Sequence, residues 1–216
     1  YGDIDTGREY YLKKPGKQRA LIEELAGKLY ILAGVPIAEI ETIRYKGEND
    51  VVKSSWIEGA KPMTAEEMRN RPEVIKNFAI DAWLANWDVI GLNYDNIVEG
   101  KDGIAYRIDP GGSLMYRAQG GTKLFSFQVQ ELQTMLDSTT SPQVAQVFGS
   151  IPDSSKKALF AEGAKKLAQI TDKQINDIVY GIFDKDDVIE NYSPADIAFK
   201  LKIRTYKIVK QLLKEE

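Results

Sequence analysis

The chain has 216 residues, of which 43% are hydrophobic and 28% charged, a balance that excludes a disordered or fibrous protein. It contains no cysteine and no histidine, which excludes disulfides, thiolate metal sites and the commonest side-chain general base. The net charge of −3 gives no field that would attract nucleic acid, and no apolar run approaches the roughly 20 residues of a membrane span, so we expect a soluble, cytoplasmic protein.

The first 60 residues are predicted to form a small β-rich unit with one helix. Residues 8–14 are rich in aromatic side chains and end at a Pro-Gly pair, which indicates a strand followed by a turn. Leucines spaced by four, four and three residues along 17–33 place one apolar stripe on a helix. Residues 37–45 and 51–57 flank a polar stretch and predict a β-hairpin.

The start of the chain favours a segment of a longer protein. Residues 2–7 read as a hairpin connection, but the chain begins too abruptly for a complete glycine-rich loop. We therefore expect it to be part of a larger polypeptide.

From residue 61 onward the pattern is mainly helical. Thr64 is followed three residues later by Glu67, which is typical of a helix start with a capping box. Apolar residues along 72–87 predict one buried helix that leads into a loop at Asp88. Further helices are expected near 127–137, 142–149, 154–169 and 172–183, and a long final helix is expected to start at Ser193-Pro194.

Two loops combine acids and amides with short apolar strands. The first runs from Asp88 to Asn96 and continues into Ile97-Val98. The second, Ile108-Asp109-Pro110-Gly111-Gly112, follows a second short apolar run. Carboxylate and amide oxygens suit a hard divalent cation, so we treat the two loops as one site for a cation and a phosphate.

The order of these features resembles a known fold. The chain presents a strand lysine, a helix glutamate, a hairpin, a connection, a helix, an Asp-to-Asn loop, a short hairpin and an Asp-x-Gly. Over about residues 8–115 this order resembles the protein-kinase-like fold, particularly its atypical members: phosphoinositide 3- and 4-kinases, HipA-type toxin kinases, and kinase-like domains of phage and effector proteins. The resemblance implies a bilobal α+β fold, with residues 1–60 as a small N-terminal β-sheet lobe carrying one helix and residues 61–216 as a mainly α-helical C-terminal lobe carrying the catalytic and metal-binding loops.

The resemblance also implies ATP and Mg²⁺ as cofactors and gives roles to residues of the first 60. Lys13 would hold the α- and β-phosphates, and Glu23 would pair with that lysine. Lys13 is preferred to Lys14 because related atypical kinases tend to show Lys-x-Pro here, although neighbours on a strand point to opposite faces and Lys14 stays an alternative. Glu24 is likewise the alternative to Glu23.

The connection between the two predicted lobes is expected to contact the base of the nucleotide. Trp56, Ile57 and Glu58 would line the adenine pocket there, mainly through backbone groups.

In the second predicted lobe, Asp88 would orient or deprotonate the acceptor hydroxyl, while Asn96 and Asp109 would bind the metal. The family spacing of this loop would select Asn93 instead of Asn96, so the choice of Asn96 requires a three-residue insertion. Asp95 is an alternative to Asp88 as the base.

The implied function is that of an atypical ATP-dependent kinase that transfers phosphate to an unidentified protein, lipid or small-molecule hydroxyl. No histidine or arginine precedes Asp88, Pro110 replaces the usual aromatic residue, and no activation segment follows, departures that favour the atypical group. Two alternatives remain. In the first, the chain would be a catalytically inactive kinase-fold interaction or scaffold domain of a larger phage or effector-type protein, located in the host cytoplasm if it is an effector. In the second, it would transfer AMP on the same fold.

Overall fold

The strands near the N-terminus pair into a three-stranded antiparallel sheet. They are β1 (Tyr10–Lys13), β2 (Ile40–Tyr45) and β3 (Glu48–Ser55), and β3 lies in the centre. Both the predicted first strand and the predicted hairpin are therefore confirmed, although β2 begins three residues later than expected. The structure, a computed structural model, describes residues 9–45 and 48–213. The predicted connection at residues 2–7 lies outside the described part of the chain.

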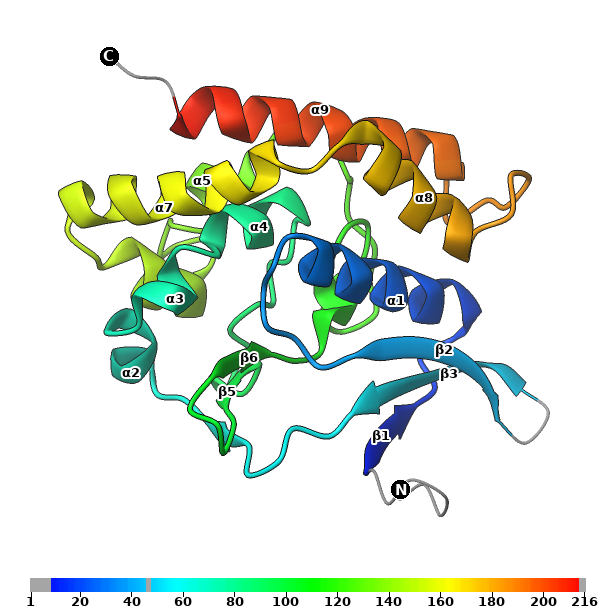
Figure 1. Cartoon of the computed structure of the whole chain (residues 1–216), viewed down its shortest axis with the longest axis horizontal. Helices are drawn as coiled ribbons and strands as arrows, with labels where there is room; N and C mark the ends of the chain where they lie inside the picture. Colours follow the sequence, from blue (N-terminus) through cyan, green and yellow to red (C-terminus); the bar gives the residue numbers. More distant parts are fainter. Residues whose placement is uncertain (1–8, 46–47, 214–216) are drawn as a thin grey trace.

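Helix α1 (Lys17–Leu32) crosses one face of this sheet (Figure 1). The chain enters it through Gly16, whose φ of 89° is a backbone conformation that side chains with a Cβ rarely adopt. The apolar stripe predicted for this segment faces the sheet and the rest of the protein, so the helix prediction is confirmed. Its buried apolar residues are Ala20, Ile22, Leu25, Ala26, Leu29 and Tyr30.

A second, smaller sheet lies beside the first. It contains β4 (Lys61–Pro62), β5 (Ile97–Glu99) and β6 (Ala105–Arg107), all antiparallel, with β5 in the centre. The β5–β6 hairpin separates the two predicted site loops: Asn96 immediately precedes β5, and Asp109 follows β6 at the start of the 3₁₀ helix η1 (Pro110–Gly112).

The predicted single helix over residues 72–87 is wrong. Helix α2 (Ala65–Arg69) has the expected capping box at Thr64, but the next segment divides into α3 (Pro72–Ile75) and α4 (Phe78–Trp83).

The break between α3 and α4 has a tertiary cause. The Asn77 side chain donates to the Glu73 carbonyl oxygen at 2.9 Å and accepts from the Lys166 ammonium at 2.9 Å. The neighbouring Lys76 carbonyl faces Gly163 of α7, where a Cβ would overlap it. Contacts from a helix some 90 residues away thus compete with the regular helical hydrogen bonds.

The helix predicted over residues 127–137 is much shorter in the structure, where only α5 (Glu131–Thr134) is helical. Arg204 accounts for the difference, because its guanidinium donates to the carbonyl oxygens of Ser126 at 2.7 Å and Gln128 at 2.9 Å, which are then not available to a helix. The segment predicted at 142–149 is helical but changes geometry, from α6 (Pro142–Val144) to the π-helical turn η2 (Ala145–Gly149).

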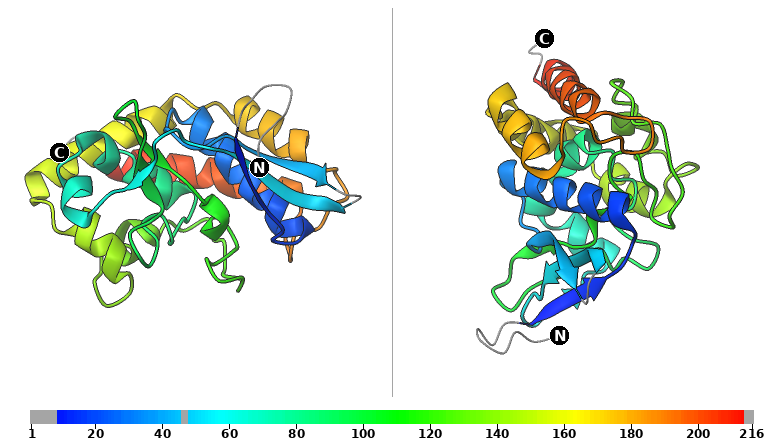
Figure 2. Two further views of the ribbon diagram at one scale, coloured as in Figure 1. Left: turned by 90° about the horizontal axis from the view of Figure 1, so that it is seen from below. Right: turned by 90° about the vertical axis from the view of Figure 1, so that its right-hand side faces the viewer.

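The last three helices are confirmed as predicted. They are α7 (Asp153–Ala168), α8 (Asp172–Ile182) and α9 (Pro194–Leu212), with Ser193 capping α9 through a capping box. Figure 2 (right) shows the layers: α8 and α9 lie on one side of α1, and the three-stranded sheet lies on the other. Among the described residues, no helix combines the length and the apolar character needed to cross a membrane.

The molecule is a mixed α+β protein with one continuous core. Side chains of α1, of the three-stranded sheet and of α4, α7 and α9 belong to a single cluster of buried apolar residues. Leu25, Val52, Phe78, Leu167 and Leu201, each buried, represent these five parts. The core extends across the sequence position at which the two lobes were predicted to meet.

Candidate functional site

A cavity of about 390 Å³ lies among β1, β3, α1 and the β5–β6 hairpin. Its lining combines a strip of apolar side chains with a small group of charged and amide side chains. Six residues singled out from the sequence line it: Lys13, Glu23, Trp56, Ile57, Asn96 and Asp109. Residues from both sides of position 60 therefore meet at one concave place, which is the usual setting of a small-molecule site.

Lys13 connects the two halves of this cavity. Its ammonium lies 2.7 Å from a carboxylate oxygen of Glu23 on α1 and 2.6 Å from one of Asp109 after β6. The Glu23 side chain is only 3% exposed, whereas that of Asp109 is 54% exposed. Glu23 thus pairs with the lysine on the buried side, whereas the Asp109 carboxylate is exposed to the cavity and to solvent.

Electrostatics keep this lysine charged. Burial opposes the ammonium form, but the charges of Glu23 and Asp109 outweigh it and raise the pKa of Lys13. Burial raises the pKa of Glu23 to about 7, against the opposing effect of Lys13. Glu23 is therefore a carboxylate whose ionised form depends on its lysine partner.

Asp109 sits in a strained turn. Its φ of 49° places the backbone in the left-handed region, and its side chain accepts a hydrogen bond from the Gly111 backbone at 3.4 Å. A Cβ at Gly111 would lie 3.1 Å from a carboxylate oxygen of Glu23 and 3.2 Å from one of Asp109. The glycine thus lets the turn approach both carboxylates closely.

Asp88 and Asn96 are joined directly. The Asn96 amide donates to the Asp88 carbonyl oxygen at 2.7 Å and to its carboxylate at 3.2 Å. The backbone N–H of Asp88 donates to the side-chain oxygen of Asn86 at 3.3 Å. Burial, followed by the negative charge of Asp109, raises the pKa of Asp88 to about 6. Asp88 lines a neighbouring cavity rather than the one around Lys13, so Asn96 lies at the boundary between the two.

The structure separates the alternatives in the loop after Asp88. Asn96 lines the cavity around Lys13, whereas Asn93 is exposed and does not line it. Asp95 also lines the cavity, and a Cβ at Gly91 would overlap its carboxylate, which requires the glycine at that position. Asp95 and Asp109 thus place two carboxylates in the lining of this cavity.

The alternatives near the N-terminus occupy different places. Lys14 is exposed and does not line the cavity that contains Lys13. Glu24 accepts from the Thr42 backbone at 2.9 Å and pairs with Lys28 at 2.6 Å. Glu24 thus helps to dock α1 on the sheet.

Of the three residues of the predicted connection, two line the cavity around Lys13 and one does not. Trp56, which is 57% exposed, and Ile57 line the cavity around Lys13. Glu58 does not line this cavity; its carboxylate pairs with Lys101 at 2.7 Å on the exposed side of the second sheet. The structure therefore brings Trp56 and Ile57 to the cavity and directs the Glu58 side chain elsewhere.

Backbone strain gathers around the two loops. Among the described residues, four of the five non-glycine residues with positive φ lie between residues 85 and 114. They are Ala85, Tyr94, Asp109 and Leu114. Such conformations cost on the order of 1–3 kcal/mol each and concentrate at functional sites. The two loops and their flanks therefore carry most of the strained non-glycine backbone in the described part of the chain.

A buried polar network joins α1, α4 and β6 next to these loops, and it was not predicted from the sequence. Arg107 of β6 binds both oxygens of Asp81 on α4, at 2.6 and 2.5 Å, and the Tyr30 hydroxyl of α1 donates to Asp81 at 2.9 Å. Asn86 donates to the same hydroxyl at 3.0 Å. The only local signal was an arginine in an otherwise apolar strand, since the partners are far apart in the sequence.

Few side chains at this site could ligate a metal. Within residues 9–45 and 48–213, no three Asp or Glu side chains are grouped so as to hold a metal ion. Asp109 and Asn96 nevertheless offer a carboxylate and an amide oxygen to the same cavity. A cation held there would need further oxygen ligands from a bound molecule or from water.

Comparisons with protein-family models, with curated proteins and with solved structures found no match to this chain.

Proposed function

We propose that this protein is an atypical Mg²⁺-dependent phosphotransferase that uses ATP, on a bilobal protein-kinase-like arrangement. The observation that carries the proposal is the position of Lys13, whose ammonium bridges the buried Glu23 at 2.7 Å and the exposed Asp109 at 2.6 Å. Lys13 thus links a buried carboxylate to an exposed one that is accessible to a metal, a combination of charges that suits phosphoryl transfer.

The lining of the cavity fits a nucleotide. Ala38, Val98 and Ile108, together with Trp56 and Ile57, provide the apolar part of its lining. These surfaces suit a planar base, while Lys13, together with a cation held by the carboxylates, suits the phosphates. A volume of about 390 Å³ lies within the range of roughly 300–1,000 Å³ for small-molecule sites.

Asp109 and Asn96 are the residues that would hold Mg²⁺. The Asn96 amide nitrogen donates to Asp88, which leaves its side-chain oxygen available as a ligand. Mg²⁺ usually takes only one or two protein carboxylates and completes its shell with phosphate oxygens and water, so two side chains suffice. When bound, the ion neutralises charge on the phosphates.

Asp88 is proposed as the group that orients the acceptor hydroxyl and takes its proton. Its carboxylate is fixed by Asn96 at the boundary between the two cavities. A raised pKa of about 6 keeps it ionised at neutral pH while making it more basic than an ordinary aspartate.

The proposal is tested by nucleotide binding and transfer in matched variants. Titration of ATP into the protein with Mg²⁺ should give saturable binding. Binding should weaken about tenfold or more in Lys13→Ala, because a charge-assisted contact is worth roughly 1.5–3 kcal/mol. Asp109→Ala should remove the Mg²⁺ dependence. Lys14→Ala is the matched control, since Lys14 does not line the cavity, and it should bind as the wild type does.

The outcomes separate the candidate functions. Binding that is identical in wild type, Lys13→Ala and Asp109→Ala would refute the assignment of the site. Binding with no transferred group would favour an interaction module that uses nucleotide only as a ligand. Mass spectrometry of the modified acceptor distinguishes phosphate from AMP.

A further inference from the structure

A second cavity, of about 590 Å³, lies on the other side of Asp88. Its walls come from the loop that follows α4, from residues 117–131, and from the start of α6. Asp88 lines this second cavity, and Asn96, which lines the first, is hydrogen-bonded to its carboxylate. A molecule in the second cavity would therefore contact Asp88, whose partner Asn96 lines the first cavity.

Two basic side chains, Lys123 and Arg117, line this second cavity together with Asp88. The Lys123 ammonium donates to the carbonyl oxygen of Gly112 at 2.6 Å and to that of Tyr116. A Cβ on Gly112 would lie only 2.8 Å from the Cβ of Asp88, so the lysine is tied to the turn that touches the proposed base. Arg117 is exposed at the rim.

Neither cation is neutralised by a carboxylate in the described part of the chain. No described Asp or Glu lies within ion-pair distance of Lys123 or Arg117. Glu131, which also lines the cavity, pairs with Arg204 at 2.9 Å. Burial lowers the pKa of Lys123 to about 7, which is the condition of an ammonium that a bound anion would stabilise.

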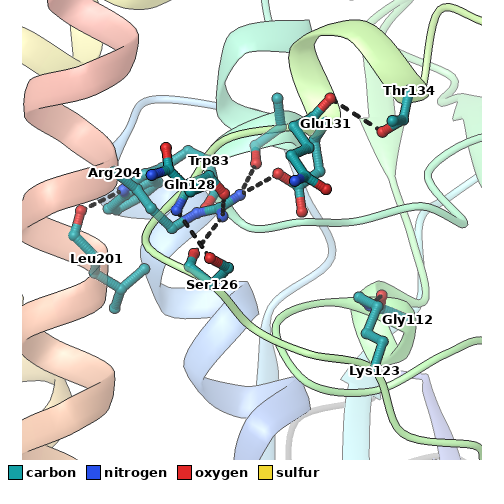
Figure 3. A network of polar contacts seen from close by, with 11 residues as sticks. Trp83, Gly112, Lys123, Ser126, Gln128, Glu131, Thr134, Leu201 and Arg204 are labelled. Atoms are coloured by element: carbon teal, nitrogen blue, oxygen red, sulfur yellow. Dashed lines mark hydrogen bonds and ion pairs between the residues drawn. The ribbon is translucent and has the colours of Figure 1, made fainter.

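Arg204 binds the part of the cavity wall that Ser126 and Gln128 form. Figure 3 shows its guanidinium at the centre of a polar network, donating to Ala82 and Trp83 at the end of α4 and to Ser126 and Gln128 on the cavity wall. The arginine thus ties that wall to the helix that leads into the Asp88 loop. The part of the wall formed by Ser126 and Gln128 is therefore held by hydrogen bonds from a buried arginine.

We propose that this second cavity binds the phosphoryl acceptor and that the acceptor is a small molecule carrying a hydroxyl and an anionic group, with the anion held by Arg117 and Lys123. The inference rests on the proposed function and adds the substrate class. In the transfer, the acceptor hydroxyl oxygen forms a bond to the γ-phosphorus and its proton passes to the Asp88 carboxylate. The bond from that phosphorus to the β–γ bridging oxygen breaks, and ADP leaves with the electron pair.

Inorganic phosphate is the probe, and the nucleotide site is filled first. The full chain is saturated with a non-hydrolysable ATP analogue and Mg²⁺, so that phosphate cannot enter the first cavity, and phosphate is then titrated calorimetrically. We expect one phosphate per chain, with a dissociation constant raised at least about tenfold in Arg117→Gln. Arg44→Gln, which changes an exposed arginine of β2, is the matched control and should bind phosphate as the wild type does.

Because Lys123 is half-buried and donates to two carbonyl oxygens, Lys123→Met serves as the second variant, read only after circular dichroism shows it folded. Nucleotide binding should be unchanged in both variants. Failure of the analogue to bind would count against the proposed function and is seen in the first titration. Absence of phosphate binding to the loaded protein, equal loss in Arg44→Gln, or equal affinity for the neutral polyol glycerol would each overturn the anionic acceptor.

Discussion

At the residue scale, the ionisation of Asp88 controls when it can take a proton. Burial and the charge of Asp109 raise its pKa from the ordinary 3.8 to about 6. Only the carboxylate can act as a base, so kcat/KM should rise about tenfold per pH unit below pH 6 and level off above it. A pH–rate profile measures this, and a flat profile from about pH 4.5 to 7.5 would contradict the role. Asp88→Asn should lack the rise.

The same raised pKa has an opposite effect on stability. The folded state holds the Asp88 proton more tightly than the unfolded state, so the contribution of this group to the free energy of unfolding falls as pH rises from about 4 to about 6. In that window activity should increase while this contribution to stability decreases. Holding the Asp88 carboxylate in a partly buried position thus lowers the free energy of unfolding above about pH 6.

Single residues of the cavity were predictable from the sequence to different degrees. That Lys13, Glu23 and Asp109 line one cavity was predictable from the order of a strand lysine, a helix glutamate and an Asp-x-Gly, which the protein-kinase-like resemblance brings together. Glu58 was placed at the nucleotide on its position alone, whereas its side chain pairs with Lys101. Lys123 gave no signal, since its partners are backbone carbonyl oxygens, which the sequence does not mark.

At the scale of elements, the contact between α7 and the α3–α4 break depends on one glycine. A Cβ at Gly163 would overlap the Lys76 carbonyl oxygen and lie 3.0 Å from the Ala79 Cβ. Gly163→Ala should therefore destabilise the protein by about 1–3 kcal/mol or more, because the two helices must move apart.

Gly181 of α8 is the matched control for that substitution. A Cβ there would meet no atom within 4 Å, so Gly181→Ala should stabilise the protein by roughly 0.5–1 kcal/mol through helix propensity. Denaturant unfolding of both variants measures the difference. Equal effects of the two substitutions would mean that α7 does not pack as described.

Helices were predicted well where their own sequence decides them. The stripe along α1 and the capping boxes at Thr64 and Ser193 are local signals, and the structure has helices there. The segments at 72–87 and 127–137 were misjudged because their hydrogen bonds go to Lys166 and Arg204, which lie far along the chain. No periodicity in the segments themselves records those partners.

At the scale of the whole molecule, the Tyr30–Asp81–Arg107 network joins α1, α4 and β6 behind the site. Asp81 and Arg107 are 0% and 2% exposed. Arg107→Met should cost about 3–5 kcal/mol, because it leaves the Asp81 carboxylate buried without its partner. Lys173→Met, which breaks the surface pair with Asp177, should leave the free energy of unfolding almost unchanged. Urea denaturation compares them, and similar effects would show that the network does not hold the fold.

The mixed α+β class was predictable from the sequence, since hairpin and helix patterns are local. The single core was not, because the cluster that joins Leu25 to Phe78 and Leu201 is defined only when the elements pack. The predicted division into two lobes at residue 60 stays a prediction.

The most direct measurement is a crystal structure of the protein with Mg²⁺ and a non-hydrolysable ATP analogue. The account predicts phosphates in contact with the Lys13 ammonium, Mg²⁺ ligated by Asp109 and Asn96, and the base against the apolar wall near Trp56 and Ile57. Nucleotide bound elsewhere, or Mg²⁺ held without Asp109, would contradict it. So would a protein that binds no nucleotide at millimolar concentration.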